Sequence, residues 1–151
     1  MAGYIERLKA NCERALVAEP ERVFILKDLE ELQGVREGIY IFRQLSGSPG
    51  ETFDRFLNFK SDNSRKCPKA NAPNWTMYVG SSTTGLKKRI AQHLGKGPEG
   101  TYALHLEFWF EEAYEIEIKI YNEAREVLQI IEDDLSEELK PAFGKQGGNN
   151  K

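Results

Sequence analysis

The chain has 151 residues, of which 40% are hydrophobic and 30% charged, a composition typical of one soluble domain rather than a fibrous or disordered protein. It contains no apolar run long enough to span a membrane, and its N-terminus becomes charged too early for a signal peptide, so we expect a cytoplasmic protein without a membrane partner. The net charge of −3 does not favour nucleic-acid binding, and two cysteines and two histidines at irregular spacings argue against a structural zinc site.

The first half of the chain begins with one clear helix and one clear strand. Apolar residues recur at helical spacing over 4–17 and predict an amphipathic helix, and residues 38–45 are rich in strand-forming side chains. A turn cluster at 46–50 follows the strand. Phenylalanines over 53–59 fit a helix and a strand equally well, whereas the polar composition of 60–74 predicts a mobile loop.

The second half alternates strands with helices. Residues 75–80 predict a strand, the apolar positions of 86–94 predict a short helix, and residues 115–120 alternate as a half-buried strand does. The aromatic segment 101–113 favours a helix over a strand, and residues 124–139 predict a long amphipathic helix. Together these elements predict an α+β fold with a small mixed sheet of three or more strands, flanked by helices.

Several residues able to take part in catalysis accompany these elements. The tripeptides Gly38-Ile39-Tyr40 and Tyr78-Val79-Gly80 lie on the first two expected strands, Arg89 and His93 are one helical turn apart, and Glu132 lies beside an apolar helical stripe. Each also has a structural explanation. Strand tyrosines commonly pack in a core, a helical arginine commonly lies at the surface, and a carboxylate beside an apolar stripe commonly forms a salt bridge.

The order and spacing of these residues resemble the GIY-YIG nuclease family. The resemblance includes a helix that begins Leu86-Lys87-Lys88-Arg89, and the spacing of Glu132, Leu135 and Pro141 near the end of the chain. It divides the chain into three expected parts: an N-terminal helical extension (1–35), a nuclease-like domain (36–144) and a flexible tail (145–151).

The resemblance implies a metal-dependent endonuclease that hydrolyses phosphodiester bonds in nucleic acid, with DNA favoured over RNA. Glu132 would bind Mg²⁺ or Mn²⁺, which prefer oxygen ligands and keep several waters. Arg89 would stabilise the negative charge of the transition state, and His93 fills the family position one turn after the arginine. The other histidine, His105, has no counterpart in the family pattern and is expected to be a packed or surface residue.

The two tripeptides have implied roles as well. Tyr78 would act as the base or proton relay that activates the attacking water, and Tyr40 would support it through a hydrogen bond. A free phenol has a pKa of about 10, so Arg89 and a metal-bound hydroxide would have to lower that value. Gly38 and Gly80 would leave room for the substrate backbone.

The chain departs from the family pattern at three places. A short hairpin usually joins the tripeptides, whereas here residues 46–74 form an insertion. Ser81 stands where the family often has lysine, and we expect it at the substrate. Gly144 stands where an asparagine is common, and Asn149 and Asn150 are the candidates to replace it.

Basic residues gather in two short runs despite the negative net charge. We expect these runs to hold the phosphate backbone of the substrate, although each is also explained as solvated surface. The residues concerned are Lys60, Arg65, Lys66 and Lys69 in the insertion, with Lys87 and Lys88 in the short helix.

A second hypothesis is a catalytically weak or inactive module that keeps the fold and binds nucleic acid or a protein. Ser81 and Gly144 favour this alternative slightly, because both depart from the family pattern. The intact set of tyrosines, arginine, histidine and glutamate favours the enzyme. In either case, a protein partner could dock through the N-terminal helix or the insertion.

Overall fold

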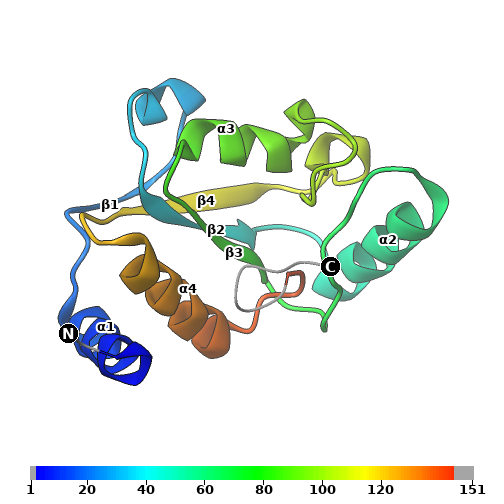
Figure 1. Ribbon diagram of the computed structural model, residues 1–151. Helices are drawn as coiled ribbons and strands as arrows, with labels where there is room; N and C mark the ends of the chain where they lie inside the picture. The colour runs from blue at the N-terminus through cyan, green and yellow to red at the C-terminus, as the bar shows by residue number, and fades with distance from the viewer. Residues whose placement is uncertain (1–2, 145–151) are drawn as a thin grey trace.

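The computed structural model describes residues 3–144 and is built around a four-stranded sheet (Figure 1). The strands are β1 (Arg22–Ile25), β2 (Gly38–Gln44), β3 (Thr76–Ser82) and β4 (Tyr114–Ile120). Their order across the sheet is β1-β4-β2-β3, so β2 is a central strand and β3 an edge strand. The predicted α+β class and the pairing of the two tripeptide strands are confirmed. The expectation of a mixed sheet is wrong, because all three pairings are antiparallel.

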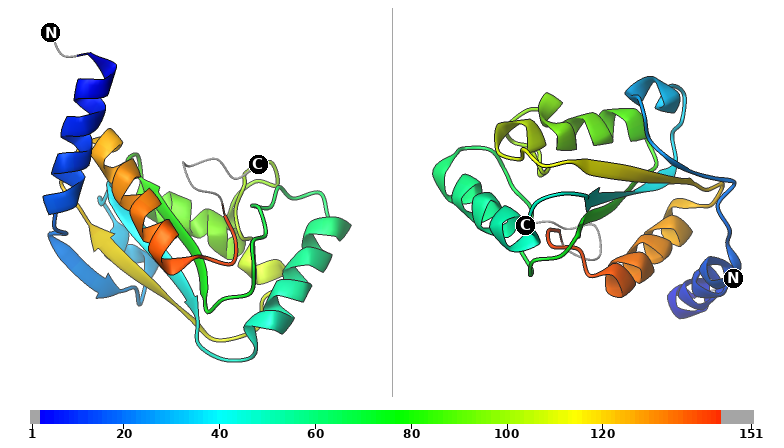
Figure 2. Two further views of the ribbon diagram at one scale, coloured as in Figure 1. Left: turned by 90° about the horizontal axis from the view of Figure 1, so that it is seen from below. Right: turned by 180° about the vertical axis from the view of Figure 1, so that it is seen from behind.

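Helices cover both faces of the sheet. Their bounds are α1 (Tyr4–Val17), η1 (Leu29–Leu32), α2 (Pro49–Asp62), α3 (Leu86–Ala91), the π-helical turn η2 (Gln92–Lys96), η3 (Leu106–Phe108) and α4 (Arg125–Leu139). Figure 1 shows α3 on one face of the sheet and α4 on the other. Figure 2 shows α1 and α2 at opposite ends of the molecule.

The central strand β2 is buried on both faces, and its alternation builds two cores. Successive side chains of a strand point to opposite faces. Tyr40 and Phe42 therefore point toward α3, and Ile39 and Ile41 point toward α4. The helix residues that cover these faces are Leu86 and Ile90 on the α3 side, and Val127, Leu128 and Ile131 on the α4 side.

The insertion (46–74) begins with a helix, and beyond residue 62 it is irregular, as the polar composition of 60–74 predicts, apart from a bridge at Ala70. It contains α2, whose N-terminus is capped by the Ser48 side chain and whose Phe56 is fully buried. The Phe56 ring centroid lies 4.1 Å from that of Phe143, and Ala70 forms an antiparallel bridge with Phe143. The insertion is therefore packed onto the end of the described chain.

The aromatic segment 101–113 is not the helix that its sequence favours. Only the short turn η3 is helical there, because His105 takes a left-handed conformation (φ 52°) that interrupts a continuous helix. Trp109 packs edge-on against Phe56, with ring centroids 5.3 Å apart. Trp109 and Phe110 of this segment thus pack against the core, whereas Phe108 is exposed.

The N-terminal region contributes a strand as well as the predicted helix. β1, which the sequence analysis did not identify, pairs with β4. α1 has the predicted bounds, but none of its residues is buried, and a 2.6 Å ion pair links Arg14 to Glu123. Within residues 3–144, no helix is both long and apolar enough to cross a membrane. The expected tail (145–151) lies outside the described residues.

Candidate active site

Tyr40 and Tyr78 lie on the same face of neighbouring strands. Tyr40 pairs with Gly80 and Phe42 pairs with Tyr78, so the two tyrosines are diagonal neighbours facing α3. Their rings are parallel, with centroids 6.1 Å apart and 6° between the ring planes. Only 1% of Tyr40 and 3% of Tyr78 is exposed. The strand pairing therefore brings both phenol rings together inside the protein.

Gly38 and Gly80 make room for other parts of the protein, and their expected contact with substrate stays a prediction. A Cβ atom at position 80 would overlap the ring and hydroxyl of Tyr40. A Cβ atom at position 38 would stand 3.0 Å from Leu86 Cδ2 and 3.0 Å from the carbonyl oxygen of Lys119. The two glycines thus set the position of the Tyr40 ring and the approach of α3 to the sheet.

His93 lies behind the tyrosines in η2 and is fully buried. Its Nδ1 accepts a 3.1 Å hydrogen bond from the Leu104 backbone N–H, and its Nε2 lies 2.9 Å from the Tyr40 hydroxyl. Because a backbone N–H only donates, the proton of the neutral ring is on Nε2, which donates to Tyr40. Burial lowers the pKa of His93 well below its usual value, and the charge of Arg89 adds to this shift. His93 is therefore a neutral donor that orients Tyr40.

The Tyr40 hydroxyl is held in its protonated form. Burial raises the pKa of Tyr40 far above its ordinary value, and Tyr78 adds to the rise, whereas the Arg89 charge opposes it. Since the Tyr40 oxygen accepts from His93, its own O–H remains to donate a hydrogen bond. Tyr40 is thus suited to donating a hydrogen bond rather than removing a proton.

Arg89 supplies the positive charge of the site. Its Nη1 donates a 3.0 Å hydrogen bond to Gln92 Oε1, and its Nη2 donates a 2.9 Å hydrogen bond to the Tyr102 carbonyl oxygen. Burial alone would lower the pKa of this guanidinium, but attraction to the hydroxyl groups of Tyr40 and Tyr78 outweighs burial and raises it. The guanidinium therefore stays charged and fixed in place beside both phenols.

Glu132 is a buried carboxylate on α4, with 5% of its surface exposed. Its Oε1 accepts a 2.6 Å hydrogen bond from the Ser81 hydroxyl, and its Oε2 accepts a 3.2 Å hydrogen bond from Gln129. The Gln129 amide also donates to Asp133, at 3.0 Å. Burial raises the pKa of Glu132 above its ordinary value, while the bonds from Ser81 and Gln129 oppose that rise.

Glu132 and the two tyrosines lie on opposite faces of the edge strand β3. Tyr78 belongs to the core beneath α3, whereas Val79 packs with α4 and Ser81 bonds to Glu132. The two faces nevertheless interact electrostatically. The charge of Arg89 opposes the burial-driven rise in the Glu132 pKa, and the charge of Glu132 contributes to the raised Tyr40 pKa.

The donor set around Glu132 fits a divalent cation held by a single carboxylate. Among residues 3–144, no group of three or more histidine, cysteine, aspartate or glutamate side chains is placed to hold a metal. Both Glu132 oxygens are bonded only to neutral donors, so a cation beside them would offset the burial that raises the Glu132 pKa. Mg²⁺ accepts such an arrangement, because it keeps several water ligands and shares others with phosphate.

The basic residues of the insertion do not act as one surface. Lys60 donates a 3.0 Å hydrogen bond to the Pro68 carbonyl oxygen. Arg65 lies over the Phe108 ring at 4.1 Å and donates to a backbone carbonyl. Both side chains are therefore engaged in holding the insertion in place. The exposed Lys69 instead lines a cavity beside the end of α4.

The remaining basic residues expected at the substrate are similarly divided. The Lys87 ammonium donates to Glu30 at 2.8 Å and to Gln33 at 3.0 Å, so it ties α3 to η1. Lys66 uses its backbone carbonyl to accept a 3.0 Å hydrogen bond from the His105 ring, and its side chain is exposed. Lys88 is also exposed. Structural roles thus account for Lys87, whereas the ammonium groups of Lys66 and Lys88 face solvent.

Sequence reasoning missed the residues that position the site. Gln92 holds Arg89, Gln129 holds Glu132, and the backbone of Leu104 sets the proton of His93. The two glutamines each lie one helical turn from the residue they hold, a spacing visible in the sequence. The Leu104 contact has no such signal, because it comes from an irregular segment brought close only by folding.

Gly144, which stands where the GIY-YIG pattern often has an asparagine, accepts a hydrogen bond from Asn71 of the insertion. Asn71 Nδ2 donates a 2.8 Å hydrogen bond to the Gly144 carbonyl oxygen and a 3.0 Å hydrogen bond to that of Pro141. The candidates suggested by the sequence, Asn149 and Asn150, lie outside the described residues.

Comparisons with known proteins assign neither a family nor a function to the chain. No family model matches the chain, and no curated protein or solved structure matches it. The interpretation of the site therefore rests on its own geometry and on the resemblance of its motifs.

Proposed function

We propose that the protein is a metal-dependent endonuclease that hydrolyses phosphodiester bonds in nucleic acid, with DNA as the favoured substrate. One observation carries the proposal: a guanidinium fixed by Gln92 and the Tyr102 carbonyl lies beside two paired phenols, and a buried carboxylate is held on the other face of the same edge strand. A cation, hydroxyl donors and a carboxylate are the groups that phosphoryl transfer requires, since this chemistry depends on positioning and charge stabilisation.

Arg89 would bind the phosphate and stabilise its added charge in the transition state. Its forked donors match phosphate oxygens, and Gln92 and the Tyr102 carbonyl hold the fork in place before substrate arrives. Tyr40 would donate to a phosphate oxygen or orient the attacking water. Because Tyr40 is held protonated, it cannot accept a proton from that water, and Tyr78 would be the phenol that relays it.

Glu132 and Ser81 would hold Mg²⁺ or Mn²⁺ on the other face of β3. When bound, such an ion supplies Lewis-acid stabilisation of a phosphate oxygen and of the leaving group. Gln129 would keep the Glu132 carboxylate oriented, since its amide also donates to Asp133.

A second candidate is a binding module without efficient catalysis, and a specific observation favours it. The two tyrosines are almost completely covered, and both oxygens of Glu132 already accept hydrogen bonds from protein donors. A module of this kind would bind nucleic acid and leave it intact.

A cleavage assay separates the two candidates. The protein would be incubated with supercoiled plasmid and with single-stranded DNA and RNA, with Mg²⁺, with Mn²⁺ and with chelator. The endonuclease proposal expects metal-dependent nicking or cutting that the Glu132→Gln variant lacks. Binding without cleavage under every condition would favour the second candidate. Metal-independent cleavage equal in the variant would indicate a contaminating nuclease.

A further inference from the structure

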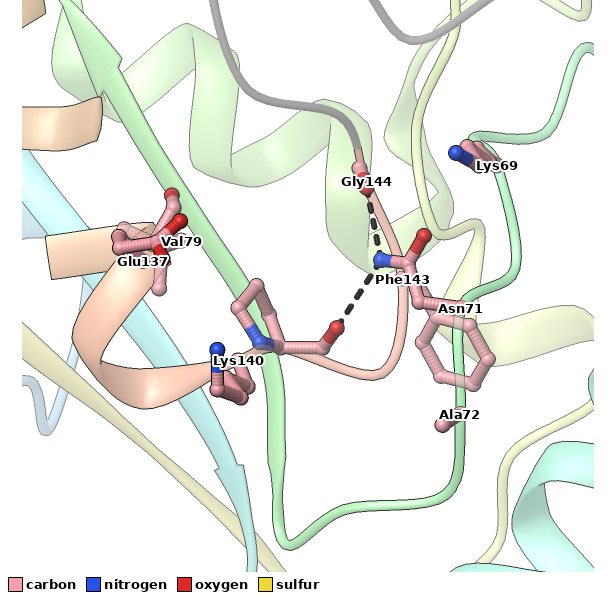
Figure 3. Close-up of a pocket in the computed structure, with 10 residues that line it drawn as sticks. Lys69, Asn71, Ala72, Val79, Glu137, Lys140, Phe143 and Gly144 are labelled. Carbon is pink, nitrogen blue, oxygen red and sulfur yellow. Dashed lines mark hydrogen bonds between the residues drawn. The ribbon is translucent and has the colours of Figure 1, made fainter. Parts of the chain in front are cut away.

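A cavity of about 660 Å³ lies beside the end of α4 (Figure 3). Its walls come from four parts of the chain: the end of α4, the segment 141–144, the insertion and Val79 of β3. Ser136, which lines it, is one helical turn after Glu132. We call this cavity the C-terminal groove, and it begins one helical turn from the proposed metal-binding carboxylate.

Lys140, on the α4 wall of the groove, has an unfavourable backbone conformation. It ends the helix in the left-handed region (φ 49°, ψ 62°), with its N–H donating 2.9 Å to the Ser136 carbonyl oxygen. Helix ends of this kind usually carry glycine, because a Cβ atom makes the left-handed conformation unfavourable. Lys140 therefore carries a conformational cost, which makes its side chain a candidate for a functional role.

Lys69 lies on the insertion wall of the groove. Its carbonyl oxygen accepts a 2.8 Å hydrogen bond from Gly144 N–H, and the Asn71 amide bonds the same segment from the insertion side. Figure 3 marks the hydrogen bond from the Asn71 amide to Gly144, and the same amide also donates to the Pro141 carbonyl oxygen. These contacts fix the insertion wall relative to α4, so the groove is preformed.

Half of the residues that line the groove are apolar or glycine: Ala72, Val79, Pro141, Phe143 and Gly144. Val79 and Phe143 form its floor and are themselves almost fully buried, and Glu137 adds one carboxylate to the lining. Ammonium groups above apolar surface suit a nucleic-acid strand, whose phosphates are anionic while its sugars and bases present apolar faces.

We infer that the C-terminal groove binds the backbone of the substrate strand on one side of the cleaved bond, with Lys140 and Lys69 contacting phosphate. The inference rests on the proposed nuclease function and assigns that site a substrate-binding extension. Lys140 follows Glu132 by eight residues, or about 12 Å along a helix axis, so the contacted phosphate is not the one being cleaved.

Lys140→Gly gives the sharpest test, because it separates function from stability. Binding would be measured by fluorescence anisotropy with a fluorescein-labelled single strand and its duplex, in chelator to prevent cleavage. The variant should bind about five- to tenfold more weakly, with a salt slope less steep by roughly 0.7–0.9. Its melting temperature should be unchanged or higher, by about 2–4 °C at most, since glycine relieves the backbone strain.

Three further variants complete the design. Lys69→Gln should weaken binding as Lys140→Gly does, and Lys140→Arg should retain binding because it keeps the charge. Lys9→Gln, on the exposed surface of α1, removes one charge elsewhere and should leave affinity unchanged. Parent-like affinity in both groove variants, with the parent binding DNA, would overturn the inference and leave the nuclease proposal intact. A parent protein that binds no nucleic acid would overturn both.

Discussion

The polar groups on the two faces of β3 differ in the partners that the protein provides for them. On the α3 face, the polar groups are partners for one another: His93 bonds to Tyr40, and Arg89 contacts both tyrosines. The two tyrosines and His93 are almost completely buried. On the α4 face, Glu132 is held only by neutral donors, and a lysine-lined groove begins one helical turn away. Under the proposed function, the first face is preorganised to stabilise charge, and the second face is completed by a cation and a substrate.

The largest effect is expected on the α4 face, from Glu132→Gln. Loss of the carboxylate should lower cleavage by more than about 10³-fold, because the amide does not hold a divalent cation well. Single-turnover cleavage at saturating Mg²⁺ measures this loss. Undiminished cleavage by the variant would remove Glu132 from the mechanism.

The same variant should be more stable than the parent at neutral pH without metal. Burial raises the Glu132 pKa, so the folded protein favours the protonated carboxyl more than the unfolded chain does. The charged form therefore destabilises the fold as pH rises, and this penalty vanishes below a pH of about 4. Thermal unfolding of the parent and of Glu132→Gln, measured between a pH of about 4 and pH 7, tests this prediction. A variant less stable than the parent at pH 7 would contradict the prediction.

The second largest effect is expected on the preorganised face, from Arg89→Ala. Cleavage should fall by about 10²–10³-fold, with a smaller change in affinity, because the guanidinium is needed most in the transition state. Arg89→Lys serves as the matched control. It keeps the charge but loses the fork that Gln92 and the Tyr102 carbonyl fix, so only partial activity should return. A fall in affinity with unchanged turnover would make Arg89 a binding residue only.

Gly80→Ala should damage the preorganised face through packing. The added Cβ would overlap the Tyr40 ring, so the ring must shift and break its bond to His93. We expect a loss of about 1–3 kcal/mol in the free energy of unfolding, measured by urea denaturation. Gly100→Ala, where a Cβ meets nothing within 4 Å, is the control. Equal stability of the two variants would mean that the Tyr40 ring is not confined as described.

The smallest effect concerns acid stability. The His93 pKa is lowered in the folded protein, so only the unfolded chain binds this proton as pH falls. The free energy of unfolding should therefore fall below a pH of about 6.5, by at most about 1.4 kcal/mol per pH unit for this group. His93→Gln should flatten the decline without abolishing it, because burial lowers the His105 pKa in the same direction. An identical pH profile in the variant would exclude His93 as a cause.

Elements with a strong internal period were predictable from the sequence. Residues 4–17, 115–120 and 124–139 have clear helical or strand spacing, and the structure has α1, β4 and α4 there within one residue. The tripeptide strands were found because glycine and tyrosine sit among strand-forming residues. Their tyrosines meet as expected, since antiparallel pairing of β2 and β3 fixes the register.

The elements and residue roles that the sequence did not predict depend on contacts between distant parts of the chain. α2 was left undecided because phenylalanines at 53, 56 and 59 fit two periods, and Phe143 supplies the surface that selects the helix. β1 spans four residues, too few for a periodic signal, and β4 provides its register. The roles of Gly80 and His93 followed from cross-strand and backbone contacts, which become visible only in three dimensions.

The placement of residues 141–144 has a consequence for how the protein is made. Ala142 and Phe143 donate 2.9 Å hydrogen bonds to carbonyl oxygens of Thr76 and Met77 at the start of β3, and Gly144 donates to Lys69. In a chain emerging from the ribosome, these residues appear after each of the four described strands and after α4. Under the proposed function, a nascent polypeptide that ends before residue 141 therefore lacks one wall of the C-terminal groove, and the groove forms only once α4 has been made.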